Sequence, residues 1–225
     1  MADPDAHVQS QAKGYFERAR QRSEAGDLDG AVEAYLDGLR LVPDDVAEGH
    51  IELRVLALQR QDRRGAKPSP EEVNRRLASG GTPLERMLNA EYLLALDPEH
   101  LAYGEALLAA AVAGGYREAA KWIADLVFLA NNNAAKPSVA LYTVLRDAYA
   151  AIGQVQRAAA ACQRAVRLNP HDKELVRAMK QLRAKLAAGV KGKPSPHHHR
   201  HAEGEKQAAG VEEDAAARQE AALAQ

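Results

Sequence analysis

Three segments of the chain end in the same way, with a leucine, one further residue and then a proline. They are Leu-Val-Pro-Asp-Asp at 41–45, Leu-Asp-Pro-Glu-His at 96–100 and Leu-Asn-Pro-His-Asp at 168–172. An apolar pattern with helical spacing precedes each segment, and proline stops a helix because it lacks the amide donor. Glycine turns lie at Gly26-Asp27, Gly114-Gly115 and Gly153-Gln154. A glycine between two helices and a proline after the second predict a series of antiparallel helix pairs.

The composition agrees with helices and argues against sheets. Alanine accounts for 47 of the 225 residues, whereas phenylalanine, tryptophan and tyrosine together make up 4%. Strands favour β-branched and aromatic side chains, whereas alanine is the best helix former because it loses no rotamer freedom on folding. We therefore predict an all-α protein whose helices pack closely through small residues.

Charge and cysteine content exclude several classes of protein. The 30 basic and 31 acidic residues give a net charge of −1, so no global field attracts nucleic acid or an anionic membrane. The single cysteine, Cys162, can form neither an internal disulfide nor a cysteine-rich zinc site. Residues 1–11 lack the apolar segment of a secretory signal, and no stretch of about 18 residues is apolar enough to span a membrane. We therefore expect a cytoplasmic protein that does not bind membranes.

Residues recur at matching positions in three of the helix pairs. Unit 12–45 has Tyr15, Ala19, Ala31, Tyr35 and Pro43; unit 100–133 has Tyr103, Leu107, Ala119, Ile123 and Asn131; unit 139–172 has Tyr142, Arg146, Ala158, Cys162, Ala165 and Pro170. On these residues the chain resembles the tetratricopeptide repeat (TPR) family over about 12–187, whose unit is about 34 residues long. Two residues depart from the family pattern, because Arg146 replaces a small residue and Asn131 replaces the stop proline.

The resemblance implies a short right-handed α-solenoid of TPR-like helix hairpins. Its units are expected at about 12–45, 46–99, 100–133 and 139–172. A C-terminal capping helix at 172–187 would cover the last apolar layer with a polar outer face. We further expect an N-terminal arm at 1–11 and a disordered tail rich in histidine, alanine and glutamate at 188–225.

The second unit is longer than the others, because 55 residues separate Pro43 from Pro98. We expect an insertion at 62–82 between a helix over 46–61 and a helix over 83–96. Ser69-Pro70-Glu71-Glu72 and Thr82-Pro83-Leu84-Glu85 are both typical of a helix start, with a capping hydroxyl, an early proline and a glutamate three residues on. The first of these predicts a short extra helix over 71–78.

We find no catalytic pattern in the sequence and expect a non-catalytic protein without a cofactor. In the TPR family the first helix of each unit lines a concave groove, so the resemblance implies a protein–protein interaction module or assembly scaffold. The groove-facing family positions correspond here to Lys13, Phe16, Glu17, Arg20, Glu105, Leu108, Thr143 and Asp147. The lysine and asparagine pattern that holds acidic chaperone tails is absent. Such a groove fits an amphipathic helix or extended peptide; the alternative is that the chain's own insertion or tail covers it.

Two alternative functions depend on other clusters. Basic residues gather at 60–76 and at 173–185, which favours a nucleic-acid-associated helical repeat, although neither cluster contains aromatic residues that would stack on bases. The other alternative is weak metal binding by a histidine cluster in the tail, formed by His197, His198, His199 and His201. We expect another protein as the partner, with nucleic acid and small molecules less favoured.

Overall fold

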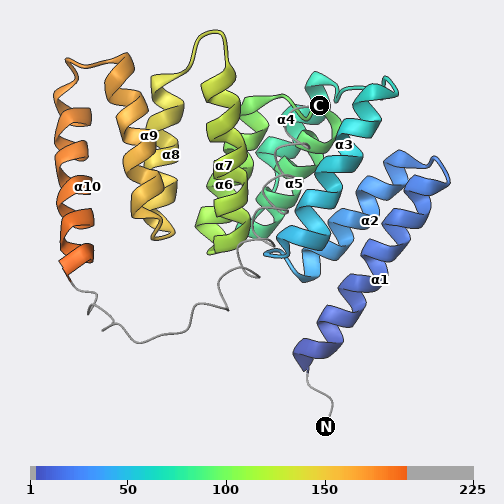
Figure 1. The fold of residues 1–225 in the computed structure, drawn as a ribbon. Helices are drawn as coiled ribbons and strands as arrows, with labels where there is room; N and C mark the ends of the chain where they lie inside the picture. The colour runs from blue at the N-terminus through green and yellow to red at the C-terminus, as the bar shows by residue number, and fades with distance from the viewer. Residues whose placement is uncertain (1–3, 192–225) are drawn as a thin grey trace, which may run out of the picture. The chain divides into compact units, whose positions relative to one another are not determined.

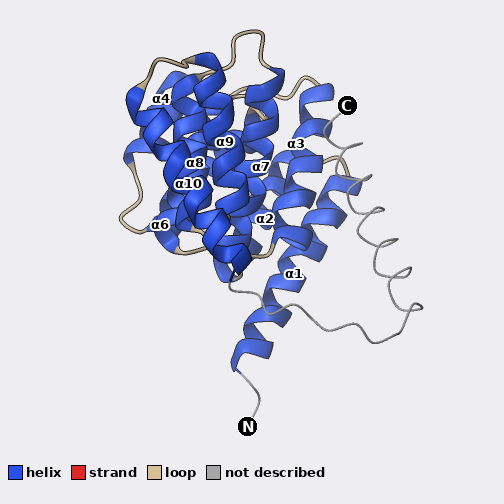
Figure 2. Ribbon diagram, turned by 60° about the vertical axis from the view of Figure 1, so that its left-hand side comes forward, coloured by secondary structure: helices blue, strands red, loops and turns tan. Residues whose placement is uncertain are grey.

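The computed structural model describes residues 4–191, and it describes side chains from residue 5 to residue 188. Within this range the chain is all-helical and contains no strand, which confirms the prediction of an all-α protein (Figure 2). The elements are α1 (Pro4–Glu24), α2 (Leu28–Leu41), the π-helical turn η1 (Val46–Ile51), α3 (Glu52–Asp62), α4 (Pro70–Ala78), α5 (Pro83–Leu96), α6 (Leu101–Gly114), α7 (Arg117–Asn133), α8 (Val139–Ala151), α9 (Val155–Leu168) and α10 (Lys173–Lys191).

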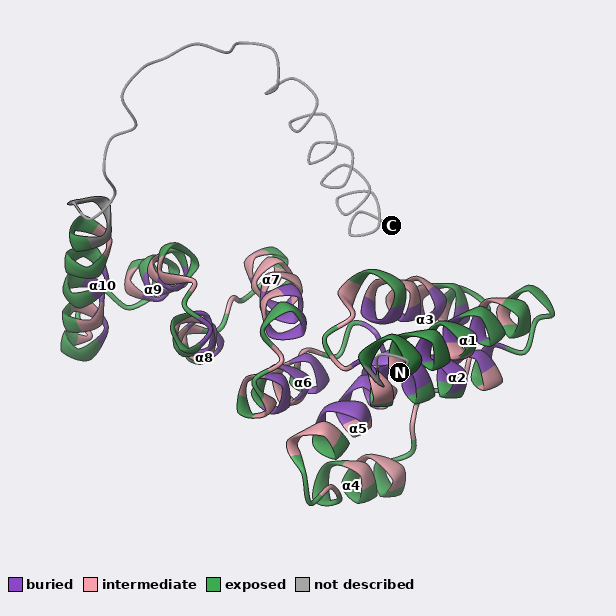
Figure 3. Ribbon diagram, turned by 90° about the horizontal axis from the view of Figure 1, so that it is seen from below, coloured by how far each residue is buried: buried purple, intermediate pink, exposed green. Residues whose placement is uncertain are grey.

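Most helices pack against the next helix along the chain (Figure 1). The closest pairs are α1 with α2, α5 with α6, and α8 with α9, while α3 and the short helix α4 both pack against α5. Seen from below, the buried faces of successive helices point toward one another (Figure 3). Residues up to Ala187 belong to one compact unit. The arrangement is therefore a helical repeat-like, all-α fold.

Local sequence signals predicted most helix ends correctly. Gly26, Gly115 and Gly153 adopt φ values of +85°, +75° and +81° in the turns between helices. The Thr82 hydroxyl accepts a hydrogen bond from the Glu85 amide, and the Glu85 carboxylate accepts one from the Thr82 amide, which completes a capping box at the start of α5. Ser69 caps α4 in the same way, through the Glu72 amide. The extra helix in the insertion is therefore confirmed.

Three helix boundaries differ from the prediction. Helix α1 begins at Pro4, so most of the predicted N-terminal arm is helical, and Val8 packs against the core there. The predicted helix over 46–61 starts with the π-helical turn η1 before α3. Helix α10 continues to Lys191, past the predicted end of the cap.

Two hydrophobic clusters meet at α5. One cluster joins α1, α2 and α3 to one face of α5 through Leu88 and Ala95. The other joins the opposite face of α5, including Met87 and Leu93, to the helices from α6 to α10. The small residues predicted at close-packing positions, Ala31, Ala119 and Ala158, are all buried. Helix α5 therefore connects the two halves of the core.

The turn η1 carries a histidine into this junction. His50 is 1% exposed, and its Nδ1 lies 3.1 Å from Oε1 of Glu91 on α5. Its ring lies 5.4 Å from that of Trp122 on α7. Burial, the strongest single influence, lowers the pKa of His50, but the Glu91 carboxylate, the Pro43 carbonyl oxygen and Asp44 together leave the pKa above its ordinary value. The fold therefore contains a buried histidine–carboxylate pair between η1 and α5.

The first helix pair depends on the absence of a side chain at Gly38. The ring of Phe16 on α1 is 1% exposed and lies over Gly38 on α2. A Cβ atom at Gly38 would approach Cε1 of that ring to 2.3 Å. This contact is too short to keep, and a buried ring cannot easily move away.

We therefore expect Gly38→Ala to lower the free energy of unfolding by about 1–3 kcal/mol, because overpacking outweighs the better helix propensity of alanine. The matched control is Gly14→Ala in α1, where a Cβ atom meets nothing within 4 Å. That change should raise the free energy of unfolding by about 0.5–1 kcal/mol. Urea denaturation of both variants measures the difference. Stabilisation by both changes would contradict the packing of Phe16 on Gly38.

Candidate partner-binding groove

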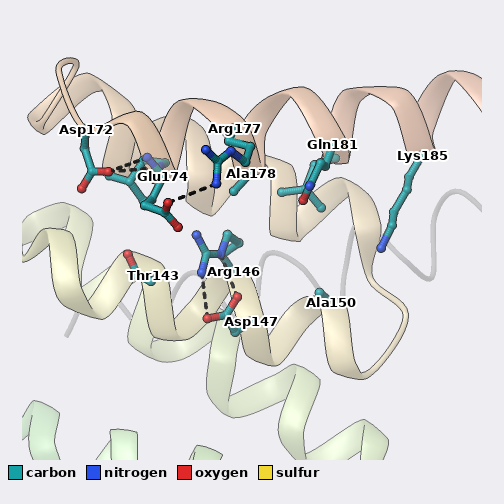
Figure 4. A pocket seen from close by; sticks show the side chains of 12 residues that line it. Thr143, Arg146, Asp147, Ala150, Asp172, Glu174, Arg177, Ala178, Gln181 and Lys185 are labelled. Carbon is teal, nitrogen blue, oxygen red and sulfur yellow. Dashed lines mark hydrogen bonds and ion pairs between the residues drawn. The ribbon is translucent and has the colours of Figure 1, made fainter.

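A groove of about 690 Å³ lies between α8 and α10. Its residues follow the same order along both helices, so α8 and α10 run parallel here (Figure 4). The wall from α8 consists of Thr143, Arg146, Asp147 and Ala150. We refer to this space as the α8–α10 groove.

Helix α10 packs against the core on one side only. Three buried side chains, Leu175, Met179 and Leu182, attach it to the core, and the Sγ atom of Cys162 on α9 lies 3.6 Å from the Leu175 carbonyl oxygen. Two of these, Leu175 and Leu182, also form the floor of the groove together with Ala178. The groove therefore has an apolar floor along α10.

Charged side chains line the rim of the groove. Arg146 makes two hydrogen bonds to the Asp147 carboxylate, at 2.7 Å from Nε and 2.9 Å from Nη2. These bonds raise the pKa of Arg146, which keeps the guanidinium charged. On the opposite wall, Nη1 of Arg177 lies 3.2 Å from the Glu174 carboxylate. The rim of the groove is therefore charged on both walls.

The two ends of the groove differ in charge. Asp172 and Glu174 lie at the end where α10 begins (Figure 4). The Asp172 carboxylate caps α10 by accepting hydrogen bonds from the amides of Glu174 and Leu175. Lys185 lies at the far end, beyond Ala150, and no acidic residue lines that end. The groove therefore has two carboxylates at one end, one of them paired with Arg177, and a lysine at the other end.

The structure brings only two of the predicted groove residues into this site. Thr143 and Asp147 both line the α8–α10 groove. Lys13 and Glu17 are exposed on α1, and Arg20 pairs with Glu17 and with Glu48 of η1. The remaining predicted polar residue, Glu105, is half-buried on α6.

Two of the predicted groove residues lie in the core instead. Phe16 is 1% exposed and Leu108 is 0% exposed, so neither can contact a partner while the protein stays folded. Phe16 turns inward because the space above Gly38 accommodates its ring. Leu108 belongs to the cluster that joins α6 to α5 and α7. Their prediction as partner-binding residues was wrong.

The wall of the groove that α10 contributes was not predicted from the sequence. Helix α10 was predicted to be a capping helix, and its basic residues were considered only as a cluster for nucleic-acid binding. Yet Glu174, Arg177, Gln181 and Lys185 recur at intervals of three and four residues, which is the spacing of one helix face. This spacing would have predicted a polar wall if α10 had been compared with the first helices of the repeats.

The two departures from the repeat pattern have separate structural roles. Arg146 forms part of the groove rim, as described above. Asn131 is buried, and its side chain accepts a hydrogen bond from the Ser138 amide and donates one to the Ser138 carbonyl oxygen. It therefore fixes the loop before α8, whereas a proline at this position could make neither bond.

Cys162 is fully buried, and burial raises the pKa of its thiol.

The basic cluster at 60–76 is largely engaged within the protein. Arg60 pairs with Asp29 at 2.7 Å, and Lys67 pairs with Asp97 at 3.0 Å. Arg76 lies 3.8 Å from the centre of the Tyr92 ring, in a cation–π contact. The basic residues of the second cluster, by contrast, are exposed on α10: Lys173, Arg177, Lys180, Arg183 and Lys185.

The predicted metal cluster of His197, His198, His199 and His201 lies outside the described residues. Among residues that the structure does describe, no group of three or more histidine, cysteine, aspartate or glutamate side chains could hold a metal ion. Between residues 4 and 191, no helix combines the length and the apolar character needed to cross a membrane.

No family model, no curated protein and no solved structure matches this chain.

Proposed function

We propose that the protein is a non-catalytic interaction module that binds a peptide or helix of another protein in the α8–α10 groove. The proposal combines the sequence resemblance to TPR repeats with the geometry of this one site. It includes the idea that the helix pairs form a short right-handed α-solenoid of the TPR kind.

The observation that supports the proposal is that two residues assigned to partner binding by the sequence resemblance line the same groove. The resemblance predicts that Thr143 and Asp147 face a partner, and both line a groove with an apolar floor and a charged rim. A charged rim contributes specificity and association rate. Protein partners commonly present an amphipathic helix or an extended segment to such a groove.

A bulky residue in the groove tests the proposal. Ala150 is exposed and lines the groove, so Ala150→Trp should block a partner without disturbing the core. We expect about a tenfold or greater loss of the bound partner, corresponding to about 1.4 kcal/mol of binding energy. The measurement is quantitative mass spectrometry of proteins that the full chain captures from a cell lysate.

The matched control is Ala160→Trp, an equally exposed position on α9 that does not line the groove. This variant should capture the same proteins as the wild type. Thermal melting of both variants checks that each remains folded. A set of proteins captured equally by wild type and both variants would contradict a binding role for the groove.

A further inference from the structure

We propose that the partner of the α8–α10 groove is an amphipathic helix that lies antiparallel to α8 and α10, with acidic residues in its first turn and basic residues in its last. This inference rests on the proposed function and adds the orientation and charge of the partner. Four features of the groove support it: its length, its floor, the direction of its walls and its charge.

The dimensions and lining of the groove fit a helix. The row from Glu174 to Lys185 on α10 covers eleven residue steps, or about 16 Å at 1.5 Å per residue. A helix of about 12–14 residues matches that length. The floor consists of Ala178, which is partly exposed, between the buried side chains of Leu175 and Leu182, so it is narrow and faces one apolar side of an amphipathic helix.

The parallel walls favour an antiparallel occupant. Helix dipoles place about half a positive charge at each N-terminus and about half a negative charge at each C-terminus. Both walls begin at the same end of the groove (Figure 4). An antiparallel helix therefore places its own C-terminus beside the N-termini of α8 and α10, where the partial charges attract.

The side-chain charges select the same orientation. The antiparallel helix would begin near Lys185 and end near Asp172 and Glu174. Acidic residues in its first turn would then face Lys185, and basic residues in its last turn would face the two carboxylates. The partial positive charges of the wall N-termini and the Arg177 guanidinium beside Glu174 reduce the acidity of that end, whereas no acidic residue lines the end at Lys185.

Two synthetic peptides of about 14 residues test the inference. Both share one apolar face of leucine and alanine; one has acidic residues at its N-terminal end and basic residues at its C-terminal end, and the other has these ends exchanged. Binding to the full chain is measured by fluorescence anisotropy at low salt, where charge interactions are least screened. The acidic-first peptide should bind more tightly.

A charge reversal in the protein separates groove contacts from the intrinsic helicity of the peptides. Lys185→Glu should shift the ratio of the two affinities about five- to tenfold toward the exchanged peptide. The matched control is Lys180→Glu, which makes the same change in net charge on the same helix but outside the groove lining. It should leave the ratio within about twofold of the wild-type value.

The outcomes distinguish this inference from the proposed function. Equal shifts in Lys185→Glu and Lys180→Glu, or no binding of either peptide, would overturn the orientation and charge assigned to the partner. The lysate comparison with Ala150→Trp would still decide independently whether the groove binds a protein. Peptide binding that occurs only after removal of residues 192–225 would show that the chain itself occupies the groove, and it would overturn the inference.

Discussion

Replacement of Glu91 by alanine is expected to lower the free energy of unfolding by about 3–5 kcal/mol. Glu91 is 3% exposed, and its carboxylate lies beside the buried His50 ring. Removal of one member of a buried charged pair leaves the other without compensation in a medium that solvates charge poorly. The pair also lies where η1, α5 and α7 meet, so its removal weakens the packing at the junction of the two core clusters. Urea denaturation at neutral pH measures the loss.

The matched control is Glu33→Ala on α2, because Glu33 is exposed. A surface change of this kind should alter the free energy of unfolding by no more than about 0.5 kcal/mol. If Glu91→Ala has an effect as small as that of Glu33→Ala, the pair does not stabilise the junction.

The pH dependence of stability provides a second measurement of the same pair. The pKa of His50 is raised in the folded protein, so the stability that it contributes is fully present below its unfolded value of about 6.5. That contribution is lost as the pH rises through the folded pKa. In Glu91→Ala the Pro43 carbonyl oxygen and the Asp44 carboxylate would still raise the pKa of His50, but burial, the strongest influence, would dominate and lower it. The contribution should then reverse and be lost as the pH falls.

The parts of the fold that depend on short-range chemistry could be predicted from the sequence. A capping hydroxyl and a glutamate three residues later are sufficient to start a helix, and Ser69 and Thr82 both did so. Glycine turns and stop prolines indicated several other helix ends for a similar reason. These signals act within one turn of helix, so no knowledge of the partner helix is needed.

Features that depend on a second helix could not be predicted in this way. The π-helical turn η1 is one example, since its position is set by the burial of His50 against Glu91 and Trp122, far along the chain. The α8–α10 groove is another. Thr143 and Asp147 were predicted from the repeat register, but the wall from α10 depends on how far that helix stands from α8. No local sequence signal predicts the distance between α10 and its neighbours.

The first helix gives the sharpest case, because it contains adjacent aromatic residues. Tyr15 and Phe16 differ by one position, or about 100° around the helix. The repeat register places Tyr15 at a recurring aromatic position and predicts that Phe16 faces the groove. The structure reverses the expectation for Phe16, which is 1% exposed, whereas Tyr15 is half-buried. Which of the two rings is buried depends on Gly38, a residue of the next helix.

This reversal predicts unequal effects of two similar substitutions. Phe16→Ala should lower the free energy of unfolding by about 3–5 kcal/mol, because it removes a fully buried ring and leaves a cavity between α1, α2 and η1. Tyr15→Ala should cost about 1 kcal/mol or less, since the ring is half-exposed and its defined contact is with the Arg18 guanidinium. Chemical denaturation of the two variants under the same conditions gives both values.

A third variant distinguishes the loss of packing from a general intolerance of change at this position. Phe16→Leu keeps much of the apolar volume over Gly38, so it should recover a large part of the stability that Phe16→Ala loses. If Tyr15→Ala costs more than Phe16→Ala, then α1 would be rotated by one residue relative to α2, as the repeat register predicts. In that case Gly38→Ala would also cease to be destabilising, because no ring would lie above it. The two tests therefore depend on one another, and agreement between them fixes the rotation of α1 from solution measurements alone.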